Sequence, residues 1–288
     1  MNVGILYSRI RKDEKLLLNE LRERDHEITK IDVRKQQFNV HNPPEIFEGV
    51  DLVLDRCLST SRSLYITRFC EAYGIPVVNG PETAETCADK VKNSLALASA
   101  GVPTPNTDVA FTTEAALESI ETFGYPCVLK PVMGSWGRLM AKLESRSAAE
   151  AILEHKETLG HYEHKVFYIQ EFVAKPDRDI RVVAVDGEPI AAMARSSDHW
   201  LTNAAKGAET EVFEPDEEAR ELVARASDAV GGGLLGIDLM ETEEGYTVHE
   251  VNHTVEFKAL NEVVETDVPA AVVDWLEAQI PAEAGVTA

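Results

Sequence analysis

The sequence predicts an N-terminal α/β domain with a parallel sheet, followed by α+β parts that contain antiparallel hairpins. From Met1 to about Cys87, short apolar runs alternate with stretches of helical periodicity, which is the pattern of strands joined by crossover helices. In the last third of the chain, apolar runs come in closely spaced pairs around turn residues, as in antiparallel hairpins. A chain of 288 residues has room for about two or three domains.

The N-terminal domain is expected to alternate strands with helices. The runs VGILY, DLVLDR and IPVVNG predict strands over residues 3–7, 51–56 and 75–80, and the stretches KDEKLLLNELRER and SLYITRFCEAYG predict helices over residues 12–24 and 63–74. No G-x-G-x-x-G follows the first strand, so a dinucleotide site is not predicted here.

The middle of the chain predicts a second domain. A helix over 90–101 ends at Gly101, and the proline-rich VPTPNT leads into the elements that follow. These are a strand over 125–131, a glycine-containing loop over 132–142, a helix over 147–160 and a strand over 166–173.

Two hairpins are predicted in the last third. The first spans 179–195 and turns at Asp186-Gly187, and the second spans 234–252. With its turn centred on Glu244, the second hairpin places Asp238 opposite Glu250 and diagonal to Asn252. The Ala-rich tail after Ile280 is expected to be frayed.

A literal G-x-G-x-x-G occurs at Gly231, Gly233 and Gly236. It follows an expected helix over 216–230 and precedes a strand, whereas a phosphate-binding fingerprint must follow a strand and open a helix. We therefore interpret it as a glycine helix stop.

The charge of the chain excludes some functions. The formal net charge of −22 disfavours general affinity for nucleic acid. Such acidity is typical of adaptation to high salt, where screening removes self-repulsion; an acidic surface that binds a basic partner is the alternative. No segment approaches the roughly 20 apolar residues that cross a bilayer, and the start MNVGILYSR lacks a signal-peptide pattern, so we expect a soluble cytoplasmic protein.

The cysteines and a histidine pair do not predict a zinc site. Cys57, Cys70, Cys87 and Cys127 are scattered without a C-x-x-C pair, so they are expected to be buried small hydrophobes. His161 and His164 in HYEH have H-x-x-H spacing but lie in a polar stretch, which favours a solvated surface over a metal site.

Oxygen-bearing side chains in the second hairpin indicate a magnesium site. Asp238, Glu250 and Asn252 converge in an otherwise apolar hairpin, and Mg²⁺ takes one or two carboxylates together with substrate phosphates. The alternative is that one or more of them lies at a solvent-facing strand end.

Basic residues and a glycine loop indicate phosphate binding. Lys130 ends the buried strand CVLK, the loop GSWGR over 134–138 offers backbone N–H groups and Arg138, and Lys90 supplies a second ammonium. Each alone is more often a surface lysine or an ordinary turn. No Ser-His or Cys-His pair is found, and we expect no catalytic nucleophile.

The order of these motifs resembles that of the ATP-grasp ligases over nearly the whole chain. It runs DK, AGVPTP, VLKP, GSWGR, IQEFV, DIRVVAV, GIDL, HEVN. The resemblance implies the ATP-grasp fold, with an N-terminal α/β domain over 1–87 and two α+β subdomains over 88–168 and 169–288 that hold ATP between them. The chain is most similar to the ligases that attach glutamate or 2-aminoadipate to an amino-group carrier protein, which EVNHTVEFK resembles specifically, and to the ribosomal-protein glutamate ligase.

Carried onto this chain, the resemblance implies a role for each matching residue. ATP phosphates would be held by Lys90 and Lys130, with Gly134, Ser135, Trp136, Gly137 and Arg138 as the loop above them. Adenine would contact Gln170, Glu171, Phe172 and Val173, and the ribose would contact Asp179. Two Mg²⁺ ions would be bound by Asp238, Glu250 and Asn252. The transferred phosphate or an incoming carboxylate would be clamped by Arg181 and Arg195 as catalytic residues. The remaining nucleotide and substrate contacts would come from Asn203, Glu256, Phe257, Lys258, Ala259 and Leu260.

The implied reaction is ATP-dependent formation of an amide bond through an acyl phosphate. The acceptor would be a small acidic amino-group carrier protein of arginine or lysine biosynthesis, and the amine would come from glutamate or 2-aminoadipate. The enzyme would be a homo-oligomer, either a dimer or a tetramer. Ala259-Leu260 matches neither the Gly-Phe associated with glutamate nor the Asn-containing pattern associated with 2-aminoadipate; an apolar Leu260 would shorten the pocket and favour glutamate. The alternatives are glutamate addition to a ribosomal protein, and a non-catalytic nucleotide- or metabolite-binding regulator.

Overall fold

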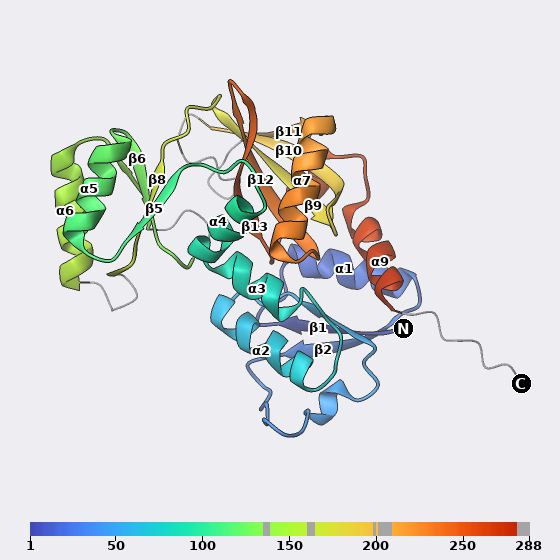
Figure 1. Ribbon diagram of the computed structural model, residues 1–288. Coiled ribbons are helices and arrows are strands. Elements are labelled where there is room, and N and C mark those ends of the chain that lie inside the picture. The colour runs from blue at the N-terminus through green and yellow to red at the C-terminus, as the bar shows by residue number, and fades with distance from the viewer. Residues whose placement is uncertain (135–138, 160–164, 198–199, 201–208, 281–288) are drawn as a thin grey trace, which may run out of the picture.

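The computed structural model describes residues 1–134, 139–159, 165–197, 200 and 209–280, which form three sheets flanked by helices (Figure 1). The N-terminal sheet and its helices make the lower part of the view in Figure 1, a five-stranded sheet lies above it, and a smaller lobe projects to the left.

The N-terminal sheet is parallel, in the order β2-β1-β3-β4, which confirms the predicted α/β domain. Its elements are β1 Asn2–Tyr7, α1 Lys12–Glu23, β2 Glu27–Asp32, η1 Glu45–Phe47, β3 Leu52–Asp55, α2 Thr60–Ala72, β4 Val77–Val78 and α3 Pro81–Ala88. The sequence did not predict β2, because this edge strand carries apolar side chains at only Ile28 and Ile31, without alternation. The strand expected over 75–80 is shorter, since Pro76 cannot donate to a ladder and Pro81 already begins a helix.

The projecting lobe has its own sheet and its own core. Antiparallel strands in the order β5-β8-β6-β7 pack against α5 and α6, and side chains such as Leu129, Leu153 and Phe167 fill the space between them. The lobe consists of β5 Thr107–Ala110, α5 Thr113–Phe123, β6 Cys127–Lys130, β7 Ala141–Leu143, α6 Arg146–Leu159 and β8 Phe167–Glu171. The preceding helix, α4 Lys90–Ser99, lies outside the lobe, against α3, α7 (Glu217–Val230) and β13 (Gly245–Asn252) (Figure 1).

The five-stranded sheet is antiparallel, in the order β11-β10-β9-β12-β13, and contains both predicted hairpins. Its elements are β9 Arg178–Val185, β10 Glu188–Ser196, β11 Glu209–Phe213, α7 Glu217–Val230, β12 Leu234–Thr242, β13 Gly245–Asn252, α8 Leu260–Val263 and α9 Val268–Gln279. The first hairpin turns at Asp186 and Gly187, both with positive φ, as its sequence predicts. Gly231 is the left-handed cap that ends α7, so the interpretation of the glycine motif as a helix stop is confirmed.

The predicted pairing in the second hairpin is confirmed, but it results from a different turn and a β-bulge. Asp238 pairs with Glu250, as predicted, and Gly236 pairs with Asn252. The turn is not centred on Glu244, because Thr242 pairs with Gly245 and a two-residue turn joins the strands. A β-bulge at His249 adds the residue that restores the predicted pairing, since Leu239 pairs with Val248.

One apolar core joins the two ends of the chain. Side chains of β1 and α1, such as Ile5 and Leu17, pack in the same cluster as Val272 and Leu276 of the C-terminal helix α9. Arg24 at the end of α1 also donates to the carboxylate of Asp274 in α9, and Figure 1 shows the two helices side by side. The apolar core beside the N-terminal sheet is therefore completed by side chains of α9, about 250 positions further along the sequence.

Asn79 ties the N-terminal domain to the second hairpin. Its buried amide donates to the carbonyl oxygens of Leu234, at 2.8 Å, and His253, at 2.7 Å, and accepts from the backbone N–H of Leu234 at 2.7 Å. These bonds fix the first residue of β12 and the residue after β13, at the open end of the hairpin, to the end of β4.

The cysteines are buried, as the sequence predicts. All four cysteines are buried free thiols, and burial raises the pKa of Cys57 and Cys70 to about 12, so they are inert small hydrophobes as predicted. Within the described ranges, none of the helices offers a stretch long and apolar enough to cross a bilayer. His161, His164 and the tail beyond residue 280 lie outside the described residues.

We expect the Asn79→Ala substitution to lower the free energy of unfolding by about 2–4 kcal/mol, because it leaves buried backbone groups of Leu234 and His253 without partners. Guanidinium chloride denaturation measures this change. Asn19→Ala, at an exposed position of α1, is the matched control. A loss no larger than that of the control would show that Asn79 does not fix the hairpin.

Candidate active site

A large pocket opens where the three sheets meet. It encloses about 410 Å³ and is lined by residues of the N-terminal domain, the projecting lobe and the five-stranded sheet. The structure brings most of the predicted site residues to it: Lys90, Lys130, Gly134, Gln170, Glu171, Phe172, Val173, Asp179, Arg181, Arg195, Asp238, Glu250, Asn252, Glu256, Lys258 and Ala259.

The other predicted residues are not at the pocket wall. Phe257 and Leu260 are fully buried in the core that joins the chain ends and are not among the residues lining the pocket. Asn203 and the loop residues Ser135, Trp136, Gly137 and Arg138 lie outside the described residues.

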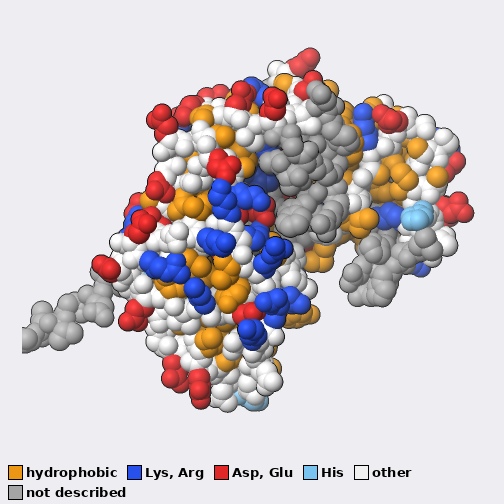
Figure 2. Space-filling view, turned by 180° about the vertical axis from the view of Figure 1, so that it is seen from behind, with side chains coloured by type: hydrophobic (Ala, Val, Ile, Leu, Met, Phe, Trp, Pro, Cys, Tyr) orange, Lys and Arg blue, Asp and Glu red, His pale blue; other side chains and the backbone are white. Residues whose placement is uncertain are grey.

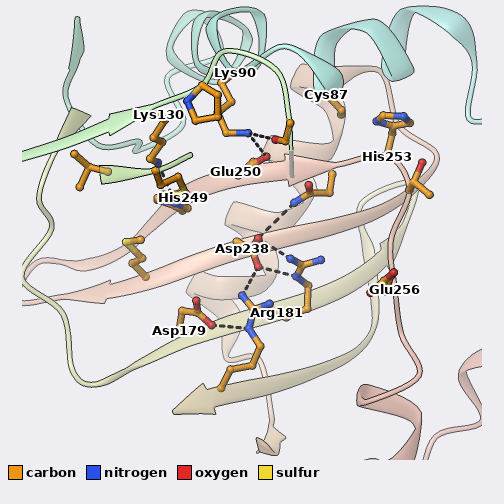
Figure 3. Close-up of a pocket in the computed structure, with 18 of the residues that line it drawn as sticks. Cys87, Lys90, Lys130, Asp179, Arg181, Asp238, His249, Glu250, His253 and Glu256 are labelled. Carbon is orange, nitrogen blue, oxygen red and sulfur yellow. Dashed lines mark hydrogen bonds and ion pairs between the residues drawn. The ribbon is translucent and has the colours of Figure 1, made fainter. Parts of the chain in front are cut away.

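A row of charges crosses three neighbouring strands at the floor of the pocket. Arg181 of β9 pairs in register with Asp238 of β12, which in turn pairs with Glu250 of β13. Side chains opposite one another in adjacent strands share a face, so all three point into the pocket, as Figure 3 shows. Gly236 makes room for this row, because a Cβ there would lie 2.9 Å from Nη1 of Arg181.

Two guanidinium groups hold Asp238. Arg181 donates from Nε and Nη2 to the two carboxylate oxygens at 2.6 and 2.7 Å, and Arg195 donates from Nη2 at 2.8 Å. Arg195 is itself fixed by Asp179, to which its Nε donates at 2.6 Å. Burial would raise the pKa of Asp238, but the charges of Arg181 and Arg195 outweigh it and hold the pKa below its ordinary value. Asp238 is therefore an ionised, nearly buried carboxylate.

Lys90 reaches the pocket from the N-terminus of α4. Its Nζ donates to the carbonyl oxygen of Gly134 at 2.8 Å and to Oε1 of Glu250 at 3.1 Å. Asp89 caps the helix by accepting from the backbone N–H of Val91 and Lys92, which fixes where the lysine side chain begins. The predicted phosphate ligand Lys90 and the predicted metal ligand Glu250 are thus in contact.

Lys130 is buried at the end of β6 among neutral groups. Its Nζ donates to Oε1 of Gln170 and to Nε2 of His249, the latter at 3.1 Å, and lies 5.9 Å from the centre of the Tyr168 ring. Within the described chain it has no ion pair with a carboxylate. Burial, as the largest cause, lowers the pKa of Lys130 from 10.5 to about 7.

His249 is a pocket residue that the sequence reasoning missed. The β-bulge places two consecutive side chains, His249 and Glu250, on the pocket side of β13, whereas regular alternation would send one of them into the core. Burial and the charge of Lys130 lower the pKa of His249 well below its ordinary value, so its neutral ring can accept a hydrogen bond from the ammonium group of Lys130. Nothing in the alternation of the strand signals this bulge.

A network from the N-terminal domain positions the segment after β13. Asp13 accepts from the backbone N–H groups of Phe257 and Lys258 at 2.7 and 2.8 Å. Arg11 forms ion pairs with Glu14 and with Glu256 at the pocket wall. The sequence reasoning missed this network as well, because acidic residues such as Asp13 and Glu14 are ordinary in the first turn of a helix, and only the structure shows that both are fully buried.

The pocket carries the opposite charge to the protein. Among its described lining residues, seven are Lys or Arg and five are Asp or Glu, in a chain whose net charge is −22. A site that is basic within an acidic protein attracts anions selectively, and a nucleotide with a diphosphate or triphosphate is such an anion.

Comparison with known proteins decides the family. Residues 3–86 match the LysX preATP-grasp domain, and residues 87–276 match the RimK-like ATP-grasp domain. The chain belongs to the RimK-like ATP-grasp family. The predicted ATP-grasp fold is therefore confirmed, and the fold is that of a family of carboxylate–amine ligases.

Relatives of this RimK-like ATP-grasp chain include named ligases. The alpha-aminoadipate–LysW ligase LysX of Saccharolobus solfataricus is 37% identical over 250 residues, which cover 86% of this chain and 90% of the relative. The glutamate–LysW ligase ArgX of Sulfolobus acidocaldarius is 30% identical over 284 residues, covering 96% and 98% of the two chains.

Solved structures agree with this assignment. An ATP-grasp RimK domain protein from Sphaerobacter thermophilus superposes with a TM-score of 0.80 at 26% identity and covers 96% of this chain and 100% of that chain. The ATP-grasp ligase PsnB, complexed with a minimal precursor, has a TM-score of 0.76 at 21% identity over 96% of this chain and 99% of its own, and shares the fold.

We expect ADP binding to weaken as the pH rises from 7 to 9. The pKa of Lys130 is about 7 in the nucleotide-free protein, so above this pH a bound phosphate must first restore the proton of the ammonium. With one linked proton, the dissociation constant rises by up to about tenfold per pH unit. Calorimetric titration measures it, and Lys130→Met should bind weakly with a flat pH profile. Equal affinity of the unsubstituted protein across this range would contradict the prediction.

Proposed function

We propose that the protein is an ATP-dependent ligase that joins the α-amine of glutamate or 2-aminoadipate to the γ-carboxyl of the C-terminal glutamate of a small acidic amino-group carrier protein. The observation that carries the proposal is the basic pocket shared by the three sheets, in a chain whose relatives are named as ligases for LysW. Those relatives are aligned over most of their own length, 90% and 98%, so both domains are included.

The described residues suit ATP with Mg²⁺. Asp238, Glu250 and Asn252 offer converging oxygen donors, with Asn252 Nδ2 3.4 Å from Oδ2 of Asp238, and this is a donor set for a hard cation. We assign two Mg²⁺ ions to these three residues; when bound, they would neutralise charge on the transferring phosphoryl group. The phosphates themselves are assigned to Lys90, Lys130 and the loop over 134–138, adenine to the strand end over 170–173, and the ribose to Asp179.

The proposed chemistry has two steps. A carboxylate oxygen of the acceptor attacks the γ-phosphorus of ATP, and the bond to ADP breaks, giving an acyl phosphate. The amine of the amino acid then attacks the carbonyl carbon, loses a proton and expels inorganic phosphate. Both steps need positioning and charge neutralisation rather than a covalent protein intermediate. As catalytic residues, Arg181 and Arg195 would supply both by clamping the transferred phosphate or a carboxylate. Asp238 holds both arginines in place.

The amine is assigned to the pocket wall formed by Glu256, Lys258 and Ala259, with Phe257 behind it and Asn203 as a further contact. Leu260 packs in the core directly after Ala259, so its effect on the length of the pocket would act through the placement of Ala259. The relatives named for 2-aminoadipate and for glutamate support both amines.

An exposed basic surface suits the acidic carrier. The carboxyl ends of the parallel strands carry exposed cations, which we call the basic edge: Arg9, Lys12, Arg34, Lys35, Arg62 and Lys258. Of the carboxylates near this edge, Asp13, Glu14 and Asp55 are buried, whereas Glu262, which pairs with Lys12, is exposed. Arg9, Lys35 and Arg62 have no ion pair with a described carboxylate. Figure 2 shows Lys and Arg side chains gathered across the middle of one face. An acidic partner would therefore meet positive charge beside the pocket despite the acidity of the whole protein.

The remaining expectations stay proposals. They are the domain boundaries after residues 87 and 168, a homo-oligomer of two or four copies, a cytoplasmic location and adaptation to high salt.

The ligase proposal is tested by mass analysis of a purified amino-group carrier protein ending in glutamate, incubated with the enzyme, ATP, Mg²⁺ and either amino acid. We expect ADP release and a carrier mass increase of one amino-acid residue. Gain with glutamate alone, with 2-aminoadipate alone or with both distinguishes the arginine, lysine and bifunctional assignments. ADP release without any carrier modification would refute the acceptor, and a ribosomal-protein C-terminus is then the next acceptor to test. ATP turnover that is indifferent to both carrier and amino acid would refute the ligase.

Reversing a charge on the basic edge should weaken binding of the carrier protein. We expect Arg62→Glu to raise the KM for the carrier severalfold at low ionic strength with kcat unchanged, and the effect to shrink as salt is added. Arg22→Glu, an equal charge change at the exposed far end of α1, is the control. Equal KM values for the two variants would exclude docking on this edge.

A further inference from the structure

We propose that Arg11 and Glu256 together bind the α-carboxylate and the α-ammonium of the incoming amino acid, so that a residue of the N-terminal domain selects amino acids over amines that lack an α-carboxylate. This inference deepens the proposed function and rests on its assignment of an amino acid as the amine. It adds Arg11 to the pocket wall that is already assigned to the amine.

The ion pair of Arg11 with Glu256 lies away from the proposed nucleotide ligands. Both side chains line the pocket, and they are 13% and 29% exposed. Figure 3 shows Asp238 between Lys130 on one side and Glu256 on the other. An amine held beside Glu256 would therefore approach the acyl phosphate from the side opposite to the proposed phosphate site.

Arg11 keeps hydrogen-bonding capacity for a ligand. Its Nε and Nη2 donate to the carboxylate of Glu14 at 3.0 and 2.7 Å, and its Nη1 donates to Glu256. A guanidinium carries five N–H groups, so these three bonds to described residues leave two. Because Arg11 lines the pocket, the two N–H groups can serve an incoming carboxylate.

The fold does not require the Arg11 side chain at this place. Arg56, which is 1% exposed, also pairs with Oε1 of Glu14, at 3.2 Å, so Glu14 has a second cation. At the start of α1, the backbone N–H of Arg11 donates to Glu14 at 2.7 Å, a bond that any residue except proline could make. Neither the neutralisation of Glu14 nor the helix start explains why the guanidinium extends to the pocket wall and contacts Glu256.

An adjacent cation and anion match the head group of an amino acid. Near pH 7 the α-amine and the α-carboxylate carry opposite charges on one carbon atom. When this head group lies antiparallel to the ion pair of Arg11 and Glu256, each charge of the ligand contacts a protein charge of the opposite sign. A lone anion such as phosphate gains one attraction and one repulsion at the same pair. This wall of the pocket therefore favours an amino acid over a phosphate.

The same pair suits both proposed amines. Glutamate and 2-aminoadipate share the head group and differ by one methylene group in the side chain. Recognition by Arg11 and Glu256 therefore selects an α-amino acid, whereas the choice between the two must come from contacts with the side chain.

The test compares each amino acid with molecules that lack one of its charges. Without the α-carboxylate, glutamate becomes 4-aminobutanoate and 2-aminoadipate becomes 5-aminopentanoate; without the α-amine, they become glutarate and adipate. Calorimetric titration of the full-length protein, with Mg²⁺ and a non-hydrolysable ATP analogue present, measures each affinity. For the amino acid that binds more tightly, we expect an affinity about 10- to 100-fold above that of either analogue, the range for losing one hydrogen-bonded charge.

Substitutions of the pair should remove these preferences. Arg11→Met should bind the amino acid no better than the analogue without the α-carboxylate, and Glu256→Gln no better than the analogue without the α-amine. A ratio of two affinities within one variant does not change when part of the protein is inactive. Arg22→Met makes the same change at the exposed far end of α1 and should keep both preferences. Glu256→Gln, at a partly exposed position, decides the inference even if Arg11→Met does not fold.

Equal affinity of the unsubstituted protein for an amino acid and its analogues would overturn the inference, and so would preferences that survive in both variants. A loss of carrier affinity in Arg11→Met with an unchanged preference for the amino acid would also overturn it, because Arg11 would then bind the acceptor. Carrier modification without these preferences would refute this inference and leave the proposed function intact. The preferences without modification of any acceptor would refute the proposed function alone.

Discussion

The pairing of β12 with β13 is the interaction on which the rest of the site depends. It sets Asp238 opposite Glu250, and the next ladder sets Arg181 opposite Asp238, so one register fixes three charged groups on three strands. A slip by one residue would turn these side chains into the apolar core and bring Ile237 or Leu239 into the pocket. The β-bulge, the turn and the hydrogen bonds of Asn79 at the open end of the hairpin all act to hold this register.

The site also shows how a protein can bury charge at its centre. The side chains of four charged residues are each at most 9% exposed: Lys90, Lys130, Asp238 and Arg195. Ion pairs and hydrogen bonds among these groups and their neighbours offset the free-energy cost of removing the charges from water. Buried charges of both signs in contact are sensitive to whichever ligand arrives, because any new charge alters several pairs at once. The large acidic excess stays on the outside, where water and salt screen it.

Local pattern predicted most of the framework and part of the site. Alternation of apolar runs identified the parallel sheet and both hairpins, and the spacing within the second hairpin predicted the contact of Asp238 with Glu250. What pattern could not predict are contacts made only by folding. Lys90 meets Glu250 across 160 positions, and Asp13 meets Phe257 across 244. His249 was missed because a bulge leaves no mark in the alternation, and β2 because an edge strand needs few apolar residues.

The packing of α9 against α1 has a consequence for how the chain is made. During synthesis, β1 and α1 emerge long before Val272 and Leu276, which complete the core that they share. Apolar surface of the N-terminal domain therefore stays exposed until α9 has also been made. A chain that ends before α9 cannot close this core, so the pocket between the sheets gains a rigid wall only after α9 has joined α1.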